Sequence, residues 1–432
     1  MSESWLQSYA RLSVFSVLDR IQHGRVNVVC KYLDKSDKGH FTVFGQENTS
    51  ELTTSIVCHV PKVWDRICGG FDLGIAEAYM MQELDCDNLG NLFSIYLANK
   101  EALGFSGGGH LSRVISRLGS LFFSANNNIA RARLNASFHY DTSNEHFKSF
   151  LSPDLNYSSA IWSSDPAETL ETAQRRKVHN ILDKAQLCAT DHVLDIGCGW
   201  GDLDMEAVKR SGCRVTGLTL SSEQKALAEQ RIKAVGLDKQ IEILLCDYRN
   251  APRPTNGYDC IVSVEMLEHV GDKYMNEYFA SISRLLSKQG RMVIQGITVV
   301  SSLNGKSSNL GDFLGRYIFP GGYLPTVNQL LASIHQGSRG TLEVEHTDNI
   351  GPHYIKTLHC WGENFMRNWD TIRASFLHKN PDANGEEVEH FRRRWMYYFE
   401  YCEAGFRSRV LNDYVISAVK VQRPVISGEV KY

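Results

Sequence analysis

Three closely spaced glycines are the residues of this chain whose spacing suggests chemistry most directly. Gly197, Gly199 and Gly201 follow an apolar run that ends in Leu194-Asp195. Glycine allows a sharp backbone turn and lets a ligand approach the main chain closely. The spacing Gly-x-Gly-x-Gly departs from the dinucleotide pattern Gly-x-Gly-x-x-Gly with its later acid, and it favours S-adenosylmethionine (SAM) over NAD. An ordinary tight turn between a strand and a helix is the alternative.

The strand ends that follow carry polar residues suited to a nucleoside. Many nucleotide-binding folds place an acid at the end of the second strand to bind the ribose hydroxyls. Thr219 stands there instead, so we expect Gln224, or less directly Glu223, to take the ribose role. Asp247 ends the third strand, where it can accept a hydrogen bond from the adenine amino group, and Tyr248 would flank the ring.

A second group of polar residues follows the fourth strand. Glu265, Glu268 and His269 have helical spacings of three and four, so they could share a face. Two carboxylates and a histidine could bind a metal, but no other acid or histidine joins them at ligand spacing. The preferred interpretation is that Glu268 faces the active site, while Glu265 is structural.

The elements expected to position these residues alternate between strands and helices. Apolar or β-branched runs predict a first strand that begins at Val193 and four further strands over 214–220, 241–249, 258–264 and 291–295. Such alternation predicts a parallel sheet with right-handed crossovers and a ligand at the carboxyl ends of the strands. All the residues named above fall at those ends.

The chain's size and composition indicate an intracellular protein of two domains. It has 432 residues, a net charge of -3 and eleven cysteines without a Cys-x-x-Cys pair. Scattered cysteines argue for reduced thiols, with no structural metal. The charge gives no global attraction to nucleic acid. No apolar stretch approaches the roughly 18 residues of a membrane span, and we expect a cytoplasmic protein without a signal peptide.

The first third of the chain divides into a small domain and a basic hinge. Residues 1–102 combine a helix over 5–18, strands over 26–32 and 55–60, a Gly69-Gly70 turn and a helix after Leu73. The hinge, 103–138, contains Arg113 and Arg117 among apolar residues and has no acid. It could lie on a membrane surface or be buried between domains, because an amphipathic helix is expected in either environment. Residues 139–432 would form the nucleotide-binding domain.

Several motifs occur in order along the chain: His139-Tyr140-Asp141, Tyr157-Ser158, Leu194 to Gly201, Glu268-His269-Val270-Gly271, Tyr317 to Gly322 and Trp395 to Phe406. Together they resemble the cyclopropane-fatty-acid synthase family of SAM-dependent lipid methyltransferases, which includes the mycolic acid cyclopropane synthases. The resemblance covers about 135–425, and 60–100 resembles the N-terminal lipid-associating domain of longer members. It implies an α/β, Rossmann-like class I methyltransferase domain with a mostly parallel seven-stranded sheet. A helical cap at about 300–410 and a small N-terminal α+β domain would complete the chain.

The resemblance also implies a cofactor, a reaction and site residues. SAM would lie on the three glycines, and its methyl would be added to a cis double bond of a phospholipid acyl chain. The residues implied around SAM are Tyr157, Ser158, Asp195, Thr219, Leu220, Gln224, Asp247 and Tyr248. In the family a bicarbonate ion then removes a proton so that a cyclopropane ring closes. Its implied holders are Ser159, Glu268, Gln295, Ile297 and Tyr354.

The chain departs from the family pattern at two positions. Ser159 replaces a typical cysteine, and Gln295 replaces a typical histidine. Backbone donors at 159 and 297 can survive, and glutamine can hydrogen-bond an anion, but it cannot carry a proton as histidine can. Methyl transfer is therefore the firmer expectation, with a cyclopropane or a methyl-branched product. Cys402 matches a cysteine considered as a nucleophile in the family, although the chemistry needs no thiol and a buried cysteine is usually inert.

Two other functions remain as alternatives. Amine N-methyltransferases acting on small molecules share this domain and its motifs, but the N-terminal domain and acid-free hinge argue for a lipid substrate. A lipid-binding protein without chemistry is disfavoured by the presence of Glu268 and Tyr354. The expected protein is a peripheral enzyme on the membrane surface, and the sequence leaves a homodimer open.

Overall fold

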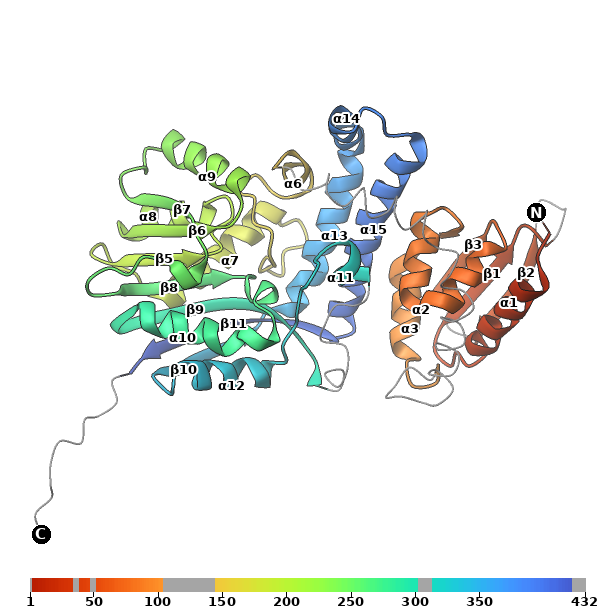
Figure 1. Ribbon diagram of the computed structural model, residues 1–432, viewed down its shortest axis with the longest axis horizontal. Helices are drawn as coiled ribbons and strands as arrows, with labels where there is room; N and C mark the ends of the chain where they lie inside the picture. The colour runs from red at the N-terminus through yellow and green to blue at the C-terminus, as the bar shows by residue number, and fades with distance from the viewer. Residues whose placement is uncertain (1, 34–38, 47–51, 104–143, 302–312, 422–432) are drawn as a thin grey trace, which may run out of the picture. The chain divides into compact units, whose positions relative to one another are not determined.

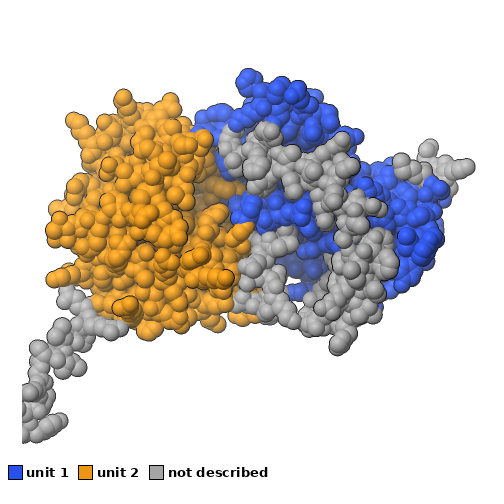
Figure 2. Space-filling view, in the orientation of Figure 1, with its two compact units in different colours: residues 1–150, 310–320, 358–408 blue, residues 151–309, 321–357, 409–432 orange. Residues whose placement is uncertain are grey.

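The computed structural model describes residues 2–33, 39–46, 52–103, 144–301 and 313–421. Most of the expected basic hinge and the His139-Tyr140-Asp141 motif lie outside these residues. The chain forms two compact units (Figure 2). Unit 1 contains 1–150, 310–320 and 358–408, and unit 2 contains 151–309, 321–357 and 409–432. Much of the expected helical cap thus belongs to the same unit as the N-terminal residues.

Unit 2 is built on a seven-stranded sheet of order β10-β11-β9-β8-β5-β6-β7. The five strands from β5 to β9 pair in parallel, and β11 pairs antiparallel with both β9 and β10. The mostly parallel seven-stranded sheet expected from the sequence is therefore confirmed. The strands are β5 (His192–Ile196), β6 (Arg214–Thr219), β7 (Ile241–Leu245), β8 (Tyr258–Val264), β9 (Leu286–Val299), β10 (Leu342–Asn349) and β11 (Leu411–Lys420).

Two hydrophobic cores lie on opposite faces of this sheet, because successive side chains of a strand point to opposite sides. On β5, Leu194 and Ile196 join one core and Val193 joins the other. Helices α10 and α12 pack into the first core and α7, α8 and α9 into the second (Figure 1). Their bounds are α7 (Leu170–Ala185), α8 (Asp202–Ser211), α9 (Ser222–Ala234), α10 (Met275–Leu285) and α12 (Val327–Gly337). Burial on both faces explains the continuous apolar runs of the central strands.

Unit 1 contains a four-stranded sheet of order β2-β1-β3-β4 and two groups of helices. The N-terminal elements are α1 (Trp5–Leu18), β1 (Arg25–Cys30), β2 (His40–Gly45), β3 (Thr53–Cys58), α2 (Lys62–Met80), β4 (Leu84–Cys86) and α3 (Leu89–Ala98). The later helices are α6 (Asn144–Phe150), α11 (Phe313–Tyr317), α14 (Trp369–Lys379) and α15 (Gly385–Arg407). Helix α13 (Gly351–Arg367) contributes residues to both units.

The expected turn at Gly69-Gly70 is wrong. Helix α2 runs without interruption from Lys62 to Met80. Trp64 and Ala78 are both buried, one on each side of the glycine pair. Packing of a long apolar face can outweigh the roughly 1 kcal/mol that a glycine costs within a helix.

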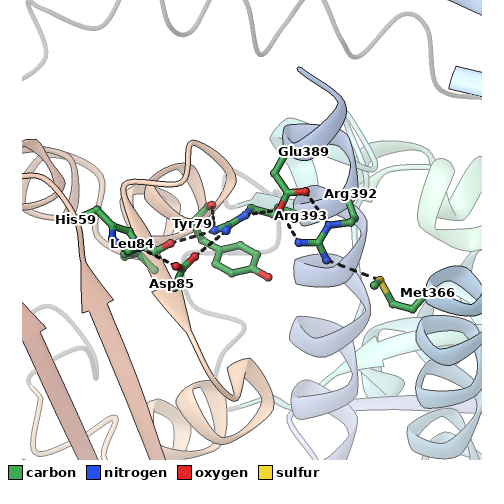
Figure 3. A network of polar contacts seen from close by, with 8 residues as sticks. All are labelled: His59, Tyr79, Leu84, Asp85, Met366, Glu389, Arg392 and Arg393. Carbon is green, nitrogen blue, oxygen red and sulfur yellow. Dashed lines mark hydrogen bonds and ion pairs between the residues drawn. The ribbon is translucent and has the colours of Figure 1, made fainter. Parts of the chain in front are cut away.

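Arg393 connects α15 with the N-terminal elements inside unit 1 (Figure 3). Its guanidinium lies 2.7 Å from Oδ1 of Asp85 and donates to the carbonyl oxygens of Tyr79 and Leu84 at 3.0 and 3.1 Å. It also lies 4.9 Å from the ring centroid of Tyr79. This one partly buried side chain therefore hydrogen-bonds both the end of α2 and strand β4. Among the described residues, no helix is long and apolar enough to cross a membrane.

Candidate active site

The three glycines form an open turn between β5 and α8. Gly197, Gly199 and Gly201 have φ values of +92°, +54° and +77°, which lie in the left-handed region that favours glycine. A Cβ atom added at Gly199 would meet nothing within 4 Å. The main chain of the turn is therefore open to a ligand, and the N-terminus of α8 follows it directly. Backbone N–H groups at such a helix start favour electronegative ligand atoms.

The residues expected around a nucleoside lie at the ends of neighbouring strands β5, β6 and β7. Thr219 ends β6, and its hydroxyl lies 2.7 Å from Oε1 of Gln224 at the start of α9. Leu220 beside them is 75% exposed, so its side chain is available to cover a ligand. Asp247 follows β7 and faces the Arg249 guanidinium, which lowers the pKa of its carboxyl. The turn and these strand ends together fit an adenosyl group.

Asp195 occupies a different environment from the other residues expected at the cofactor. It is buried at the end of β5, and burial raises its pKa to about 6. Asp204 of α8 is its neighbour, and burial together with the charge of Asp195 raises the pKa of Asp204 well above its usual value. Two adjacent buried carboxyls are most stable when they share a proton.

The segment around Tyr157 and Ser158 is fixed by two buried residues of α7. Lys177 donates to Oγ of Ser158 at 2.8 Å and to Oδ1 of Asn156 at 3.0 Å. Gln174 donates to the Ser158 carbonyl at 2.7 Å. Sequence reasoning missed both residues, although Gln174 and Lys177 fall on the buried stripe of α7. A polar residue on an apolar helical stripe is the signal that could have found them.

Glu265 is the centre of the second polar group. Its Oε1 accepts from the Ser159 N–H at 2.8 Å and from Nε2 of Gln295 at 2.9 Å. Its Oε2 accepts from the Tyr354 hydroxyl at 2.7 Å. Three of the residues expected to surround bicarbonate thus meet on a carboxylate that the sequence analysis had set aside as structural. Ser159 takes part through its backbone, so replacing a typical cysteine leaves this contact intact.

Glu268 lies in a short 3-10 helix, Leu267–His269, and has fewer donors. Its Oε1 accepts from the Ile297 N–H at 2.6 Å, while its buried Oε2 has no partner among the described residues. Burial, and then the negative charge of Glu265, raise the pKa of Glu268 to about 8. The raised pKa favours the protonated form of Glu268, in contrast to a carboxylate that receives several donors.

Asp413 on β11 is a further acid that sequence reasoning missed. Nε2 of Gln295 donates to its Oδ2 at 2.8 Å, so one amide group links Asp413 with Glu265. Burial and the charge of Glu265 raise the pKa of Asp413 well above its usual value. The sequence gives little indication that Asp413 belongs to this group, because it comes 118 residues after Gln295. The two residues meet only through the antiparallel pairing of β11 with β9.

The two polar groups belong to one site. Met266 packs on the glycine turn, since a Cβ on Gly197 would meet its Cγ at 3.2 Å, and Ser263 donates to the Ile196 carbonyl at 3.0 Å. The loop that carries Glu265 therefore lies against the turn expected to hold the cofactor. Cys402 lies buried on α15 in unit 1, and its role stays a prediction.

This sheet order, with a glycine turn after β5 and polar strand ends, defines a class I SAM-dependent methyltransferase. The family model for mycolic acid cyclopropane synthetase matches residues 127–416. The chain belongs to this family of SAM-dependent enzymes.

Two curated relatives and one solved structure illustrate the family relationship. Tuberculostearic acid methyltransferase of Mycobacterium tuberculosis is 37% identical over 300 residues, which are 68% of this chain and 66% of that protein. Cyclopropane-fatty-acyl-phospholipid synthase of Escherichia coli is 34% identical over 351 residues, 81% and 83% of the two chains. A mycolic acid cyclopropane synthase solved with SAH and CTAB aligns with a TM-score of 0.57 and 28% identity, covering 67% of this chain and 98% of that one.

The residues present fit SAM but do not fit a bicarbonate ion in the expected place. SAM supplies an electrophilic methyl group, and the glycine turn with the strand ends leaves space for its adenosyl part. For bicarbonate, the expected donors from Ser159, Gln295 and Tyr354 are already engaged by Glu265.

Proposed function

We propose that this enzyme adds the methyl carbon of SAM to a cis double bond in an unsaturated acyl chain of a phospholipid. The product is a cyclopropane or a methyl-branched fatty acyl chain, and the branched chain keeps one double bond because one proton is lost for each methyl group added. The observation that carries the proposal is the cluster of buried carboxyl groups, Glu265, Glu268 and Asp413, in the sheet that holds the glycine turn. The similarity to a cyclopropane-fatty-acyl-phospholipid synthase supports the choice of substrate.

The carboxyl cluster suits a reaction that passes through a carbocation. An alkene is a weak nucleophile, so its attack on a methyl group leaves positive charge on the acyl chain. The negative charge of Glu265, held in place by its three hydrogen bonds, stabilises such positive charge without reorganisation. The glycine turn and strand ends orient the methyl donor, and the Tyr157-Ser158 segment, fixed by Lys177, closes over it. Amine methylation would need no proton acceptor for a carbocation.

Mass spectrometry of the acyl chains tests this function. The enzyme is incubated with SAM and phospholipid vesicles that contain cis-unsaturated chains, and the released fatty acids are analysed. We expect unsaturated chains to gain one methylene unit, while fully saturated vesicles give no product. Fragmentation then separates ring from branch. Methylation of small amines without any change in the acyl chains would support the N-methyltransferase alternative instead.

Docking of the N-terminal domain on a membrane is the second part of the proposal. Helix α1 exposes Trp5, Tyr9 and Leu12, whose exposed fractions are 76%, 67% and 56%. These residues are four and three apart and so follow one side of the helix. Tryptophan and tyrosine favour the boundary between lipid and water. The basic segment with Arg113 and Arg117 would add attraction to anionic lipid.

A further inference from the structure

The bicarbonate position implied by the family resemblance is filled by a side chain of this protein. Three donors, the Ser159 N–H, the Gln295 amide and the Tyr354 hydroxyl, lie 2.7–2.9 Å from the two carboxylate oxygens of Glu265. A carboxylate and bicarbonate share a planar pair of oxygens and a single negative charge. Glu265 therefore satisfies the same donors that a bound bicarbonate would require.

The electrostatics of the cluster oppose a second anion. Glu268 and Asp413 are near enough for the charge of Glu265 to raise the pKa of both. A bicarbonate ion brought to the same donors would meet the negative charge of Glu265 at short range, and like charges in a buried site disfavour each other strongly. Lys177 contributes positive charge to Glu265, but burial lowers the pKa of Lys177.

The backbone at Glu265 points to the same use of its side chain. Its φ is +48°, in the left-handed region, and its N–H donates to the Gln295 carbonyl at 2.8 Å. Glycine would adopt this conformation without strain. A non-glycine residue held in such a conformation is typical of functional sites.

We propose that the Glu265 carboxylate replaces bicarbonate as the proton acceptor of the reaction, so that the enzyme works without bicarbonate. This inference rests on the proposed function. The π electron pair of the alkene forms a bond to the methyl carbon, and the sulfur leaves with the pair of the broken S–C bond. The cation on the adjacent chain carbon then loses a proton from the new methyl carbon to Glu265, and the C–H pair closes the ring. If a hydride shift comes first, the same proton loss leaves a methylene group.

Among the three neighbouring acids, Glu265 is the one placed to be ionised before the reaction. It accepts three hydrogen bonds, and donors to a carboxylate favour its charged form. Burial raises its pKa, while the Tyr354 hydroxyl and the Ser159 N–H oppose that rise. The raised pKa values of Glu268 and Asp413 favour their protonated forms, and a protonated carboxyl group cannot accept a further proton.

The test compares wild type with Glu265→Gln and Glu265→Gly in assays with and without bicarbonate. Wild type should keep its rate in CO₂-free buffer. Glu265→Gln keeps the shape but cannot accept the proton, so its rate should fall at least ~100-fold, in the range of general-base catalysis. Glu265→Gly opens the position without backbone strain, and added bicarbonate should restore part of its activity. The exposed Glu343→Gln is the matched control, and SAH affinity should be unchanged in all variants.

A binding measurement separates this inference from the proposed function. Carbon-13 NMR of labelled bicarbonate should show binding to Glu265→Gly and none to wild type. Bicarbonate binding by wild type, a bicarbonate requirement of its activity, or full activity of Glu265→Gln would overturn the role of Glu265 and leave the lipid reaction standing. Wild type that forms no acyl product even with bicarbonate would contradict the proposed function and the proton transfer together. The NMR comparison would then still decide whether Glu265 fills the anion position.

Discussion

At the scale of single residues, the two departures from the family pattern have physical explanations. The Ser159 side chain bonds the Ala160 carbonyl, while its backbone N–H makes the contact to Glu265. Gln295 uses both hydrogens of one amide group, toward Glu265 and Asp413. A neutral histidine ring has one N–H and could not donate to both acids. Glutamine therefore suits a site whose anion is part of the protein.

The raised pKa of Glu268 predicts that the stability of the protein depends on pH. A carboxyl with a folded-state pKa of about 8 binds its proton more tightly folded than unfolded. Stability should therefore fall as the pH rises from about 4.5 to about 8 and level off above that. Glu268→Gln should remove up to ~1.4 kcal/mol per pH unit of this slope. Urea unfolding measured across this range, with Glu343→Gln as the control, tests the prediction. An unchanged slope would show that Glu268 ionises normally in the folded state.

At the scale of elements, α15 is fixed to the N-terminal part of unit 1 by a few specific contacts. Both Arg393 and its neighbour Arg392 bond Glu389 of their own helix, and Arg392 also contacts Met366 of α13 (Figure 3). Only Arg393 of this pair reaches Asp85, Tyr79 and Leu84. The two arginines are adjacent in sequence but differ in what they connect. They form a matched pair for testing the junction.

Arg393→Met should destabilise this junction more than Arg392→Met does. Arg393→Met removes one donor from the Tyr79 and Leu84 carbonyls and from Asp85, which keeps His59 as its other partner. The free energy of unfolding should therefore fall by about 1–3 kcal/mol. Arg392→Met should cost less than ~1 kcal/mol, because Arg392 pairs mainly with Glu389 one turn away on its own helix. Hydrogen exchange at the end of α2 and in β4, together with denaturant unfolding, measures both effects. Equal losses in the two variants would contradict the assigned role of Arg393.

At the scale of the whole molecule, the chain combines a catalytic unit with a unit that carries an exposed apolar helix face. The residues Trp5 and Tyr9 of α1 lie in unit 1, and the glycine turn and carboxyl cluster lie in unit 2. A substrate whose acyl chain lies in a bilayer requires an enzyme that stays at the membrane. The proposed membrane contact and the proposed chemistry therefore belong to different units of the chain.

Vesicle binding should respond differently to two kinds of surface change. Trp5→Ser with Tyr9→Ser should weaken binding similarly at low and high salt, because hydrophobic burial is not screened. Arg113→Gln with Arg117→Gln should weaken binding more at low salt, where charge attraction is strongest. Val235→Ser, which changes an exposed apolar residue of unit 2, should leave binding unchanged. Sedimentation with anionic vesicles at two salt concentrations is the measurement. Equal losses at both concentrations for the arginine variant would indicate that these residues pack within the protein.

The sequence by itself determined the α/β order, the parallel strands and the glycine turn, because each depends on local patterns of apolar residues and glycines. The sequence-based prediction was wrong at Gly69-Gly70. The two glycines locally favour a turn, but tertiary packing keeps α2 helical across them. The prediction also preferred Glu268 to Glu265, because spacing within a short segment cannot show which acid meets distant donors. Ser159 and Tyr354 lie 106 and 89 residues from Glu265. Only the folded sheet and the left-handed backbone at Glu265 bring their hydrogen-bond donors to its carboxylate, and so decide which acid lies at the centre of the site.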